Sequence, residues 1–397
     1  MRAIRWISAG LLLLLVTACA PQVPGSAPLV ITPAATATAT VQVKPTLPPT
    51  ASPTATLVPS PQPTATPAPT QGATATLLTV GGQPVKFLAI APDGLLRYSV
   101  LADGIARSED GGRTWQRVSD QVLRGPLLIS QRDPHTLLAG APLSCYRGDG
   151  DLLLRRSTDG GATWQRVENG DGIQPVATDA GDSQIIYGIS CAGLYVSRDG
   201  GQTWQATASS QGLVISAIIP AGNGRPLLLG VLTSEGGTSH LVWFDEQGRV
   251  SQDLAQGLSF WGTGALATTE ENLYVATSTG VWRSADGAHW VLYTDGLGDV
   301  TLKSDPLQEP VPQEAFDRGF GLFSLAVDPN SQGQRLVLGT IRGLYISNDG
   351  GEHWQPAPEA GALAQLRINA LAWDPQEKGV LYATTPQGVW RVVMRNS

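Results

Sequence analysis

The stretch Ser157-Thr-Asp-Gly-Gly-Ala-Thr-Trp164 recurs along the chain. Matching stretches begin at Ser108, Ser197 and Ser347, and one that is shorter by a residue begins at Ser284. Five copies of so particular a pattern indicate an internal repeat. Asp-Gly is a strong hairpin signal, because a tight turn needs the positive φ that glycine adopts readily. The stretch therefore predicts a turn between two antiparallel strands, repeated through the domain.

Each copy lies in a larger unit that reads as four short strands. In one complete unit, the runs 323–329, 335–339 and 343–347 precede the turn and are rich in β-branched and aromatic residues. Within the turn, we expect the Asp carboxylate to accept backbone N–H groups and the Trp to be buried between neighbouring sheets. The residues with these structural roles are Ser108, Asp110, Gly112, Trp115, Ser157, Asp159, Gly161, Trp164, Ser197, Asp199, Gly201, Trp204, Ser284, Asp286, Trp290, Ser347, Asp349, Gly351 and Trp354.

Seven such units can be counted in the globular segment, residues 76–397. The last stops at Met394 after three strands, and residues 75–80 would supply its missing outer strand. Joining the two ends in this way removes exposed sheet edges. We therefore expect an all-β fold, a single seven-bladed β-propeller of four-stranded antiparallel blades closed by an N-terminal strand.

The repeat resembles the Asp-box, or BNR, repeat of sialidases, sortilin-type receptors, xyloglucanases and photosystem II assembly propellers. The resemblance covers nearly all of residues 80–395. It implies a β-propeller and leaves the function open, because one fold can hold many unrelated sites.

The N-terminus is typical of an exported protein. Arg2 and Arg5 precede the apolar run 11–16, which ends in small residues. The ending at Cys19 resembles the lipobox of bacterial lipoproteins, which implies that residues 1–19 are a signal peptide and that Cys19 carries a lipid. A cleaved signal with an incidental cysteine is the alternative. We expect an extracytoplasmic, membrane-anchored lipoprotein, at the cell surface or in the periplasm.

Residues 20–75 are dominated by Pro, Thr, Ala and Ser. Such a segment has few large apolar side chains to offset the entropy of folding, so we expect a disordered tether. The remaining cysteines, Cys145 and Cys191, fall in loops between the second and third strands of adjacent units. Thiols outside the cytoplasm tend to pair. The sequence leaves two alternatives open: a disulfide between these cysteines, or two free buried thiols.

The candidate binding residues lie in loops. Turns after the third strand of each unit share one face of a propeller, and the loops between the second and third strands and the connections between units share the other. The longest insertion on this second face is 294–320. Binding residues concentrate on long loops of a rigid scaffold. The candidates are Tyr146, Arg147, Trp261, Asp317, Arg318 and Arg342, with ordinary solvated loop residues, or blade core for Trp261, as the alternative.

Several functions find no support in the sequence. A net charge of −7 argues against a nucleic-acid surface. The Arg-Ile-Pro motif of sialidases is absent, and so are a Cys/His cluster and a phosphate-binding loop. We expect no catalytic residue, metal or cofactor. The predicted function is a non-catalytic binding or assembly module for a protein or glycan partner. The alternatives are a carbohydrate-active enzyme, sialidase-like or another glycoside hydrolase with a divergent active site, and a structural envelope protein. Glycoside hydrolysis needs two acids at a fixed separation, and the sequence singles out no such pair.

Overall fold

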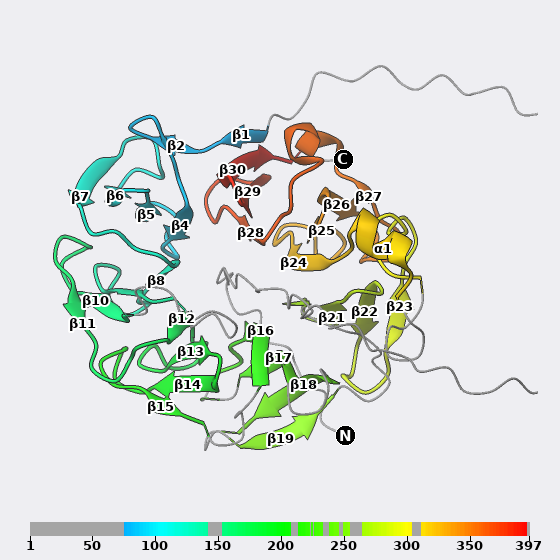
Figure 1. The fold of residues 1–397 in the computed structure, drawn as a ribbon, viewed down its shortest axis with the longest axis horizontal. Helices are drawn as coiled ribbons and strands as arrows, with labels where there is room; N and C mark the ends of the chain where they lie inside the picture. The colour runs from blue at the N-terminus through cyan, green and yellow to red at the C-terminus, as the bar shows by residue number, and fades with distance from the viewer. Residues whose placement is uncertain are drawn as a thin grey trace, which may run out of the picture. The chain divides into compact units, whose positions relative to one another are not determined.

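The computed structural model describes residues 75–141, 153–207, 213–222, 224, 226–232, 238–245, 249–254, 264–303 and 311–394. These residues form seven four-stranded antiparallel sheets and one two-stranded sheet. Figure 1 shows the four-stranded sheets following one another in chain order around a common centre. The predicted all-β propeller of four-stranded blades is thus confirmed.

Six of the sheets consist of four consecutive strands each. They are β4 (Phe87–Ile90), β5 (Arg97–Val100), β6 (Ile105–Ser108) and β7 (Gln116–Ser119); β8 (Leu127–Ile129), β9 (Leu137–Ala139), β10 (Arg155–Ser157) and β11 (Gln165–Arg166); β12 (Gln174–Thr178), β13 (Ile186–Ser190), β14 (Gly193–Ser197) and β15 (Gln205–Ala206); β16 (Leu213–Ile219), β17 (Leu227–Leu232), β18 (Thr238–Phe244) and β19 (Val250–Asp253); β20 (Ala265–Thr268), β21 (Leu273–Ala276), β22 (Val281–Ser284) and β23 (Val291–Tyr293); and β24 (Leu322–Val327), β25 (Leu336–Thr340), β26 (Gly343–Ser347) and β27 (Gln355–Pro356). We call these six sheets blades one to six.

The remaining four-stranded sheet is composite. It contains β28 (Ala370–Trp373), β29 (Val380–Thr385) and β30 (Gly388–Val393), with β1 (Ala75–Leu77) at its outer edge. β1 runs antiparallel to β30 and places Leu77 opposite Trp390. Each first strand contacts the first strand of the next sheet, from β4 through β28, and β30 contacts β4. The composite sheet thereby joins the two ends of the domain.

The expectation of seven blades is corrected accordingly. Six blades are self-contained, and the seventh four-stranded sheet is a composite of both ends of the domain. The predicted closing strand 75–80 is also divided, because β1 ends at Leu77 while β2 (Thr79–Val80) pairs with β3 (Gln83–Pro84) in a separate hairpin. The physical reason is that Gly81 and Gly82 both adopt positive φ, 58° and 80°, and turn the chain back.

Tryptophan side chains fill the space between neighbouring blades. Trp204, which precedes β15 of blade three, packs with Leu138 and Leu154 of blade two. A Cβ atom on Gly188 would lie 2.7 Å from the Trp204 ring, so only glycine permits this approach. Burial of such large aromatic faces accounts for much of the stability of a blade junction.

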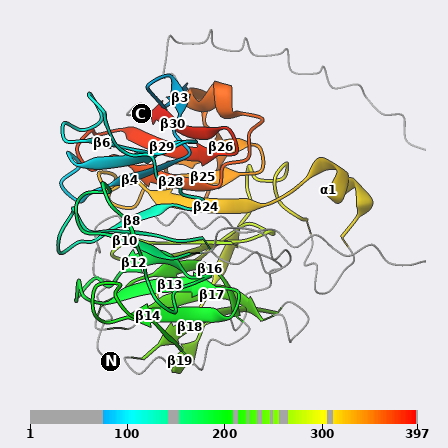
Figure 2. The ribbon, with the colours of Figure 1, turned by 60° about the vertical axis from the view of Figure 1, so that its left-hand side comes forward.

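Among the described residues, two short helices lie in connections between sheets. α1 (Gln313–Arg318) belongs to the connection from blade five to blade six, and the 3-10 helix η3 (Pro358–Leu363) to the connection from blade six to the composite sheet. In the turned view of Figure 2, α1 stands away from the sheets. Within the described ranges, no helix has the length and hydropathy needed to cross a membrane.

Candidate binding face

The repeated turns are closed by hydrogen bonds among their own residues. In blade two, Ser157 Oγ donates to Asp159 Oδ1 at 2.8 Å and accepts from the Gly161 N–H at 2.9 Å. Asp159 also accepts from the Thr163 N–H at 2.9 Å and from the Thr163 hydroxyl at 2.6 Å. The Trp164 indole donates to the Gly161 carbonyl at 2.9 Å. The carboxylate is therefore engaged inside its own turn.

Donors around a carboxylate stabilise its ionised form. The Thr163 hydroxyl and N–H lower the pKa of Asp159 to about 2. Burial raises the pKa of Asp349, but bonds from His353 and Ser347 outweigh it and leave that pKa at about 2. Hydrogen bonds also lower the pKa of Asp110. These Asp side chains act as ionised acceptors that hold turns together.

Two turns carry histidine where the others carry threonine. His289 Nδ1 lies 2.7 Å from Asp286 Oδ2, and His353 Nδ1 lies 2.6 Å from Asp349 Oδ2. In the shortened copy, the Trp290 indole donates to the Leu254 carbonyl at 3.2 Å, outside its own turn. The repeat thus keeps its acceptor carboxylate while the donor varies.

Sequence reasoning missed a link between successive turns. Arg156 Nε donates to the Gly200 carbonyl of the next blade at 3.3 Å, and Arg283 Nη1 donates to the Gly350 carbonyl at 2.9 Å. In both cases the arginine immediately precedes the serine of its own turn, and the acceptor is the first glycine of the next turn. Arginine before that serine was the signal that could have revealed the link.

The opposite end of the sheets carries the loop face, which we define as the described parts of two connections, 297–303 with 311–321 and 357–369, together with the turn 340–343. The start of the first connection lies against the repeat turn of blade six instead, where the Trp354 N–H donates to the Asp295 carbonyl at 3.1 Å. The Ile341 N–H donates to the Gly321 carbonyl at 3.1 Å, and the Gly343 N–H donates to the Leu366 carbonyl at 2.8 Å. The turn that holds Arg342 is therefore bonded to both connections. Three chain segments that are distant in sequence form one surface.

A cation of the loop face lies over an aromatic ring at the edge of this face, near the start of β24. The Arg367 Cζ atom is 3.9 Å from the centroid of the Phe323 ring. The register of β24 against β25 shifts between Leu322 and Ser324, which places Phe323 at a bulge. Bulges re-aim side chains, and a guanidinium over a ring is attracted by its negative face. Arginine and aromatic residues are enriched at protein interfaces.

Two charged residues of the face affect the pKa of the buried side chain of Tyr345. Burial raises the pKa of Tyr345, Asp299 raises it further and Arg342 lowers it. Asp299 of the insertion 294–320 and Arg342 of the turn thus act on the pKa of one residue, Tyr345. Within the described residues, no three His, Cys, Asp or Glu side chains gather as ligands for one metal ion.

The structure describes only some of the predicted binding residues. Arg342 lies in the turn between β25 and β26, and Asp317 and Arg318 are the last residues of α1, on the connection to which that turn is bonded. The side chains of Asp317 and Arg318 lie outside the described part of the structure, as do Tyr146, Arg147 and Trp261 entirely. Phe323 and Arg367 were not predicted, because no repeat or loop insertion singles them out.

The predictions for the cysteines also fall partly outside the described ranges. Cys191 is disulfide-bonded and lies between β13 and β14. Cys19 and Cys145 are both outside the described residues, so the pairing of Cys145 with Cys191 and the lipid on Cys19 stay predictions.

The family described as photosynthesis system II assembly factor YCF48 matches residues 101–383. The resemblance of the repeat to BNR-type propellers is thereby confirmed. No curated protein sequence matches the chain.

Solved structures with the same fold include proteins of different functions. A GH74 xyloglucanase from Xanthomonas campestris has a TM-score of 0.57 and 18% identity, over 81% of this chain and 53% of the enzyme. YCF48 bound to D1 peptide has a TM-score of 0.53 and 15% identity, over 82% of this chain and 97% of that one. The β-propeller domain of Cps50 (Swd1) from Myceliophteria thermophila has a TM-score of 0.51 and 14% identity, over 81% and 99%. The chain spans about half the length of the xyloglucanase, and at these identities the likeness shows the fold alone.

Proposed function

The chain belongs to the family of photosynthesis system II assembly factor YCF48, and from this premise we propose that it is a non-catalytic module that binds a segment of a partner protein on its loop face. One observation carries the proposal: the family match extends over residues 101–383, and a YCF48 protein has been solved with a D1 peptide bound. A partner of this kind suits a rigid propeller that presents loops on one face.

The geometry of the loop face supports a protein partner. The turn of Arg342 is hydrogen-bonded to the connections on both sides, so the groups it carries are held in place before binding. Arg367 and Phe323 add a cation and an aromatic face nearby. Preorganised arginine and aromatic side chains are typical of the few residues that dominate interface energies.

The glycoside hydrolase alternative receives less support. Hydrolysis of a glycosidic bond needs two carboxyl groups at a set separation across the sugar. The carboxylate of Asp159 accepts three hydrogen bonds within its turn, as does that of Asp110. The likeness to the xyloglucanase rests on 18% identity and half of that enzyme's length. It supports a shared fold and no particular chemistry.

The proposal places the module outside the cytoplasm, anchored through a lipid on Cys19. Residues 20–75 would act as the tether between the lipid and the propeller. A Cys19→Ser variant should lose both incorporation of a palmitate analogue and retention in the membrane fraction. Equal labelling of the variant and the wild type would contradict the anchor.

Partner binding is tested by reversing one charge on each end of the sheets. We expect Arg342→Glu to reduce recovery of cross-linked partner proteins with the tagged full chain at least tenfold, because it removes a guanidinium from the loop face. Arg113→Glu is the matched control, since Arg113 is an exposed residue of a repeat turn at the other end of blade one. Equal recovery with both variants would contradict the loop face as the binding surface. Circular dichroism melts of both variants verify folding.

A further inference from the structure

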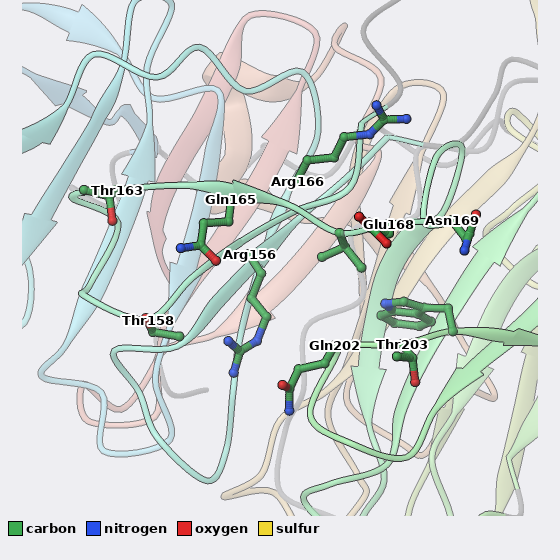
Figure 3. Close-up of a pocket in the computed structure, with 11 residues that line it drawn as sticks. Arg156, Thr158, Thr163, Gln165, Arg166, Glu168, Asn169, Gln202 and Thr203 are labelled. Carbon is green, nitrogen blue, oxygen red and sulfur yellow. The ribbon is translucent and has the colours of Figure 1, made fainter.

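A groove separates the outer part of blade two from the repeat turn of blade three. Its volume is about 410 Å³, within the range of small-molecule sites. Figure 3 shows Gln165 and Arg156 on one side of the groove and Gln202 and Thr203 on the other. None of these residues belongs to the loop face.

The lining combines an apolar base with neutral polar walls. Val167 and Trp204 line the groove and are 5% and 9% exposed. The amides of Gln165, Asn169 and Gln202 also line it. Each amide offers both donors and an acceptor, so it matches groups that are themselves donor and acceptor, such as hydroxyls.

The ionised groups around the groove do not favour a charged ligand. Arg156 and Glu168 both line it and carry opposite charges. Arg166 also lines it and forms an ion pair with Asp171. A strongly anionic ligand would meet Glu168, and a cationic one would meet the arginines.

Local backbone geometry fixes the polar wall. Gln165 lies directly opposite Arg156 in the β10–β11 pair, so both side chains project from the same face of the sheet. Asn169 has a φ of 56°, in the left-handed region that asparagine tolerates better than most residues. These positions hold the amide of Gln165, the guanidinium of Arg156 and the amide of Asn169 along one groove.

We propose that this groove binds a neutral oligosaccharide. The hydroxyls of a sugar would exchange hydrogen bonds with the amides of Gln165 and Asn169 and donate to the amide oxygen of Gln202, whose Nε2 already donates to the Asp199 carbonyl at 2.8 Å. The base at Val167 and Trp204 is almost fully buried, so the polar walls supply most of the contacts. Among the lining residues only Val167 and Trp204 are apolar, and both are almost fully buried, so the groove offers little to anchor an apolar side chain of a peptide, which favours a sugar. This site is separate from the loop face and does not rest on the proposed protein partner.

The test uses the full chain and a panel of cellotetraose, xylotetraose, maltotetraose, mannotetraose and chitotetraose. Binding is detected by saturation-transfer difference NMR and quantified by calorimetry. We expect at least one sugar to bind, and the double variant Gln165→Ala/Asn169→Gly to weaken it about tenfold or more, the effect of losing several hydrogen bonds. Glycine at 169 keeps the positive φ while removing the amide.

Gln355→Ala is the matched control, because Gln355 follows Trp354 in β27 as Gln165 follows Trp164, and it is also exposed. Its affinity for the sugar should equal that of the wild type. The proposal is overturned if no sugar of the panel binds, if the double variant binds as tightly as the wild type, or if a peptide competes for the groove where the sugars do not.

Discussion

Arg97 and Asp374 form a buried ion pair across the junction between blade one and the composite sheet. Arg97 Nη2 lies 2.8 Å from Asp374 Oδ2, and the side chains are 5% and 0% exposed. The Tyr382 hydroxyl accepts from Arg97 Nη1 at 2.6 Å and donates to Asp374 Oδ2 at 3.1 Å. The pair therefore lies at the point where the two ends of the domain meet.

Removing one partner of this pair should destabilise the propeller strongly. Arg97→Met or Asp374→Leu alone leaves a buried charge without its partner, which costs about 3–5 kcal/mol of unfolding free energy. The double variant Arg97→Met/Asp374→Leu should lose much less than the sum, because no unpaired charge remains. Urea denaturation gives the unfolding free energies of the wild type, the two single variants and the double variant. Additive losses would show that the two residues do not act as a pair.

Deleting residues 75–81 should lower the melting temperature of the full chain and promote aggregation. The deletion removes β1 and exposes the edge of β30, with Trp390 opposite the lost Leu77. Deletion of seven residues from the preceding Pro/Thr-rich segment is the control and should leave the melting temperature unchanged. Equal melting temperatures for both deletions would contradict the closure of the composite sheet by β1.

Asp159→Ala should lower stability without affecting partner capture. The carboxylate accepts from Ser157 and from both donors of Thr163. Their loss costs about 1–3 kcal/mol of unfolding free energy, measured in urea. Thr158→Ala, a change at the adjacent position of the same turn, is the control for stability. A variant that keeps full stability would show that the turn does not depend on its carboxylate.

The histidine-bearing turns should make stability depend on pH near neutrality. Bonds from Asp286 and Asp349 raise the pKa values of His289 and His353 above the usual 6.5. The protonated histidines therefore contribute fully to the free energy of unfolding below pH 6.5, and this contribution is lost as the pH rises through their raised pKa values. His289→Thr/His353→Thr restores the residue found at 114, 163 and 203. The melting temperature of the wild type minus that of this variant should be larger at pH 5.5 than at pH 8.5, and a constant difference would contradict the assignment.

Acid should destabilise the turns, because their Asp carboxylates become protonated. The lowered pKa values of Asp159 and Asp349, about 2 in each case, mean that these carboxylates stabilise the fold above pH 4. That contribution is lost as the pH falls from about 4 toward 2. Asp159→Asn should flatten this part of the stability curve, as followed by circular dichroism. An unchanged acid limb in the variant would contradict the lowered pKa of Asp159.

The repeated turns could be predicted from the sequence, because each turn is closed by interactions between residues that are close in sequence. Ser157 bonds to Asp159 and the Trp164 indole bonds to Gly161, all within eight residues, so the pattern is visible along the chain. The boundary of the closing strand was not visible in this way. It depends on the positive φ of Gly81 and Gly82 and on pairing with β30 at the far end of the domain.

The loop face was harder to predict for the same reason. Phe323 and Arg367 are 44 positions apart and meet only because the first strands of neighbouring sheets lie side by side. Arg342 could be chosen because it stands in a turn between two recognisable strands. The ion pair of Arg97 with Asp374 links opposite ends of the domain. The two residues are far apart in the sequence, so no local sequence pattern predicts their contact.

Site-specific cross-linking tests the central claim, that the loop face holds a partner protein. A photoreactive amino acid replaces Gln365, an exposed residue of the connection before β28, or Arg113 on the repeat-turn face, in the full chain within its own cells. We predict a discrete covalent adduct from position 365 and none from position 113. An adduct from position 113 alone, or no adduct from either position, would contradict the assignment of partner binding to this face.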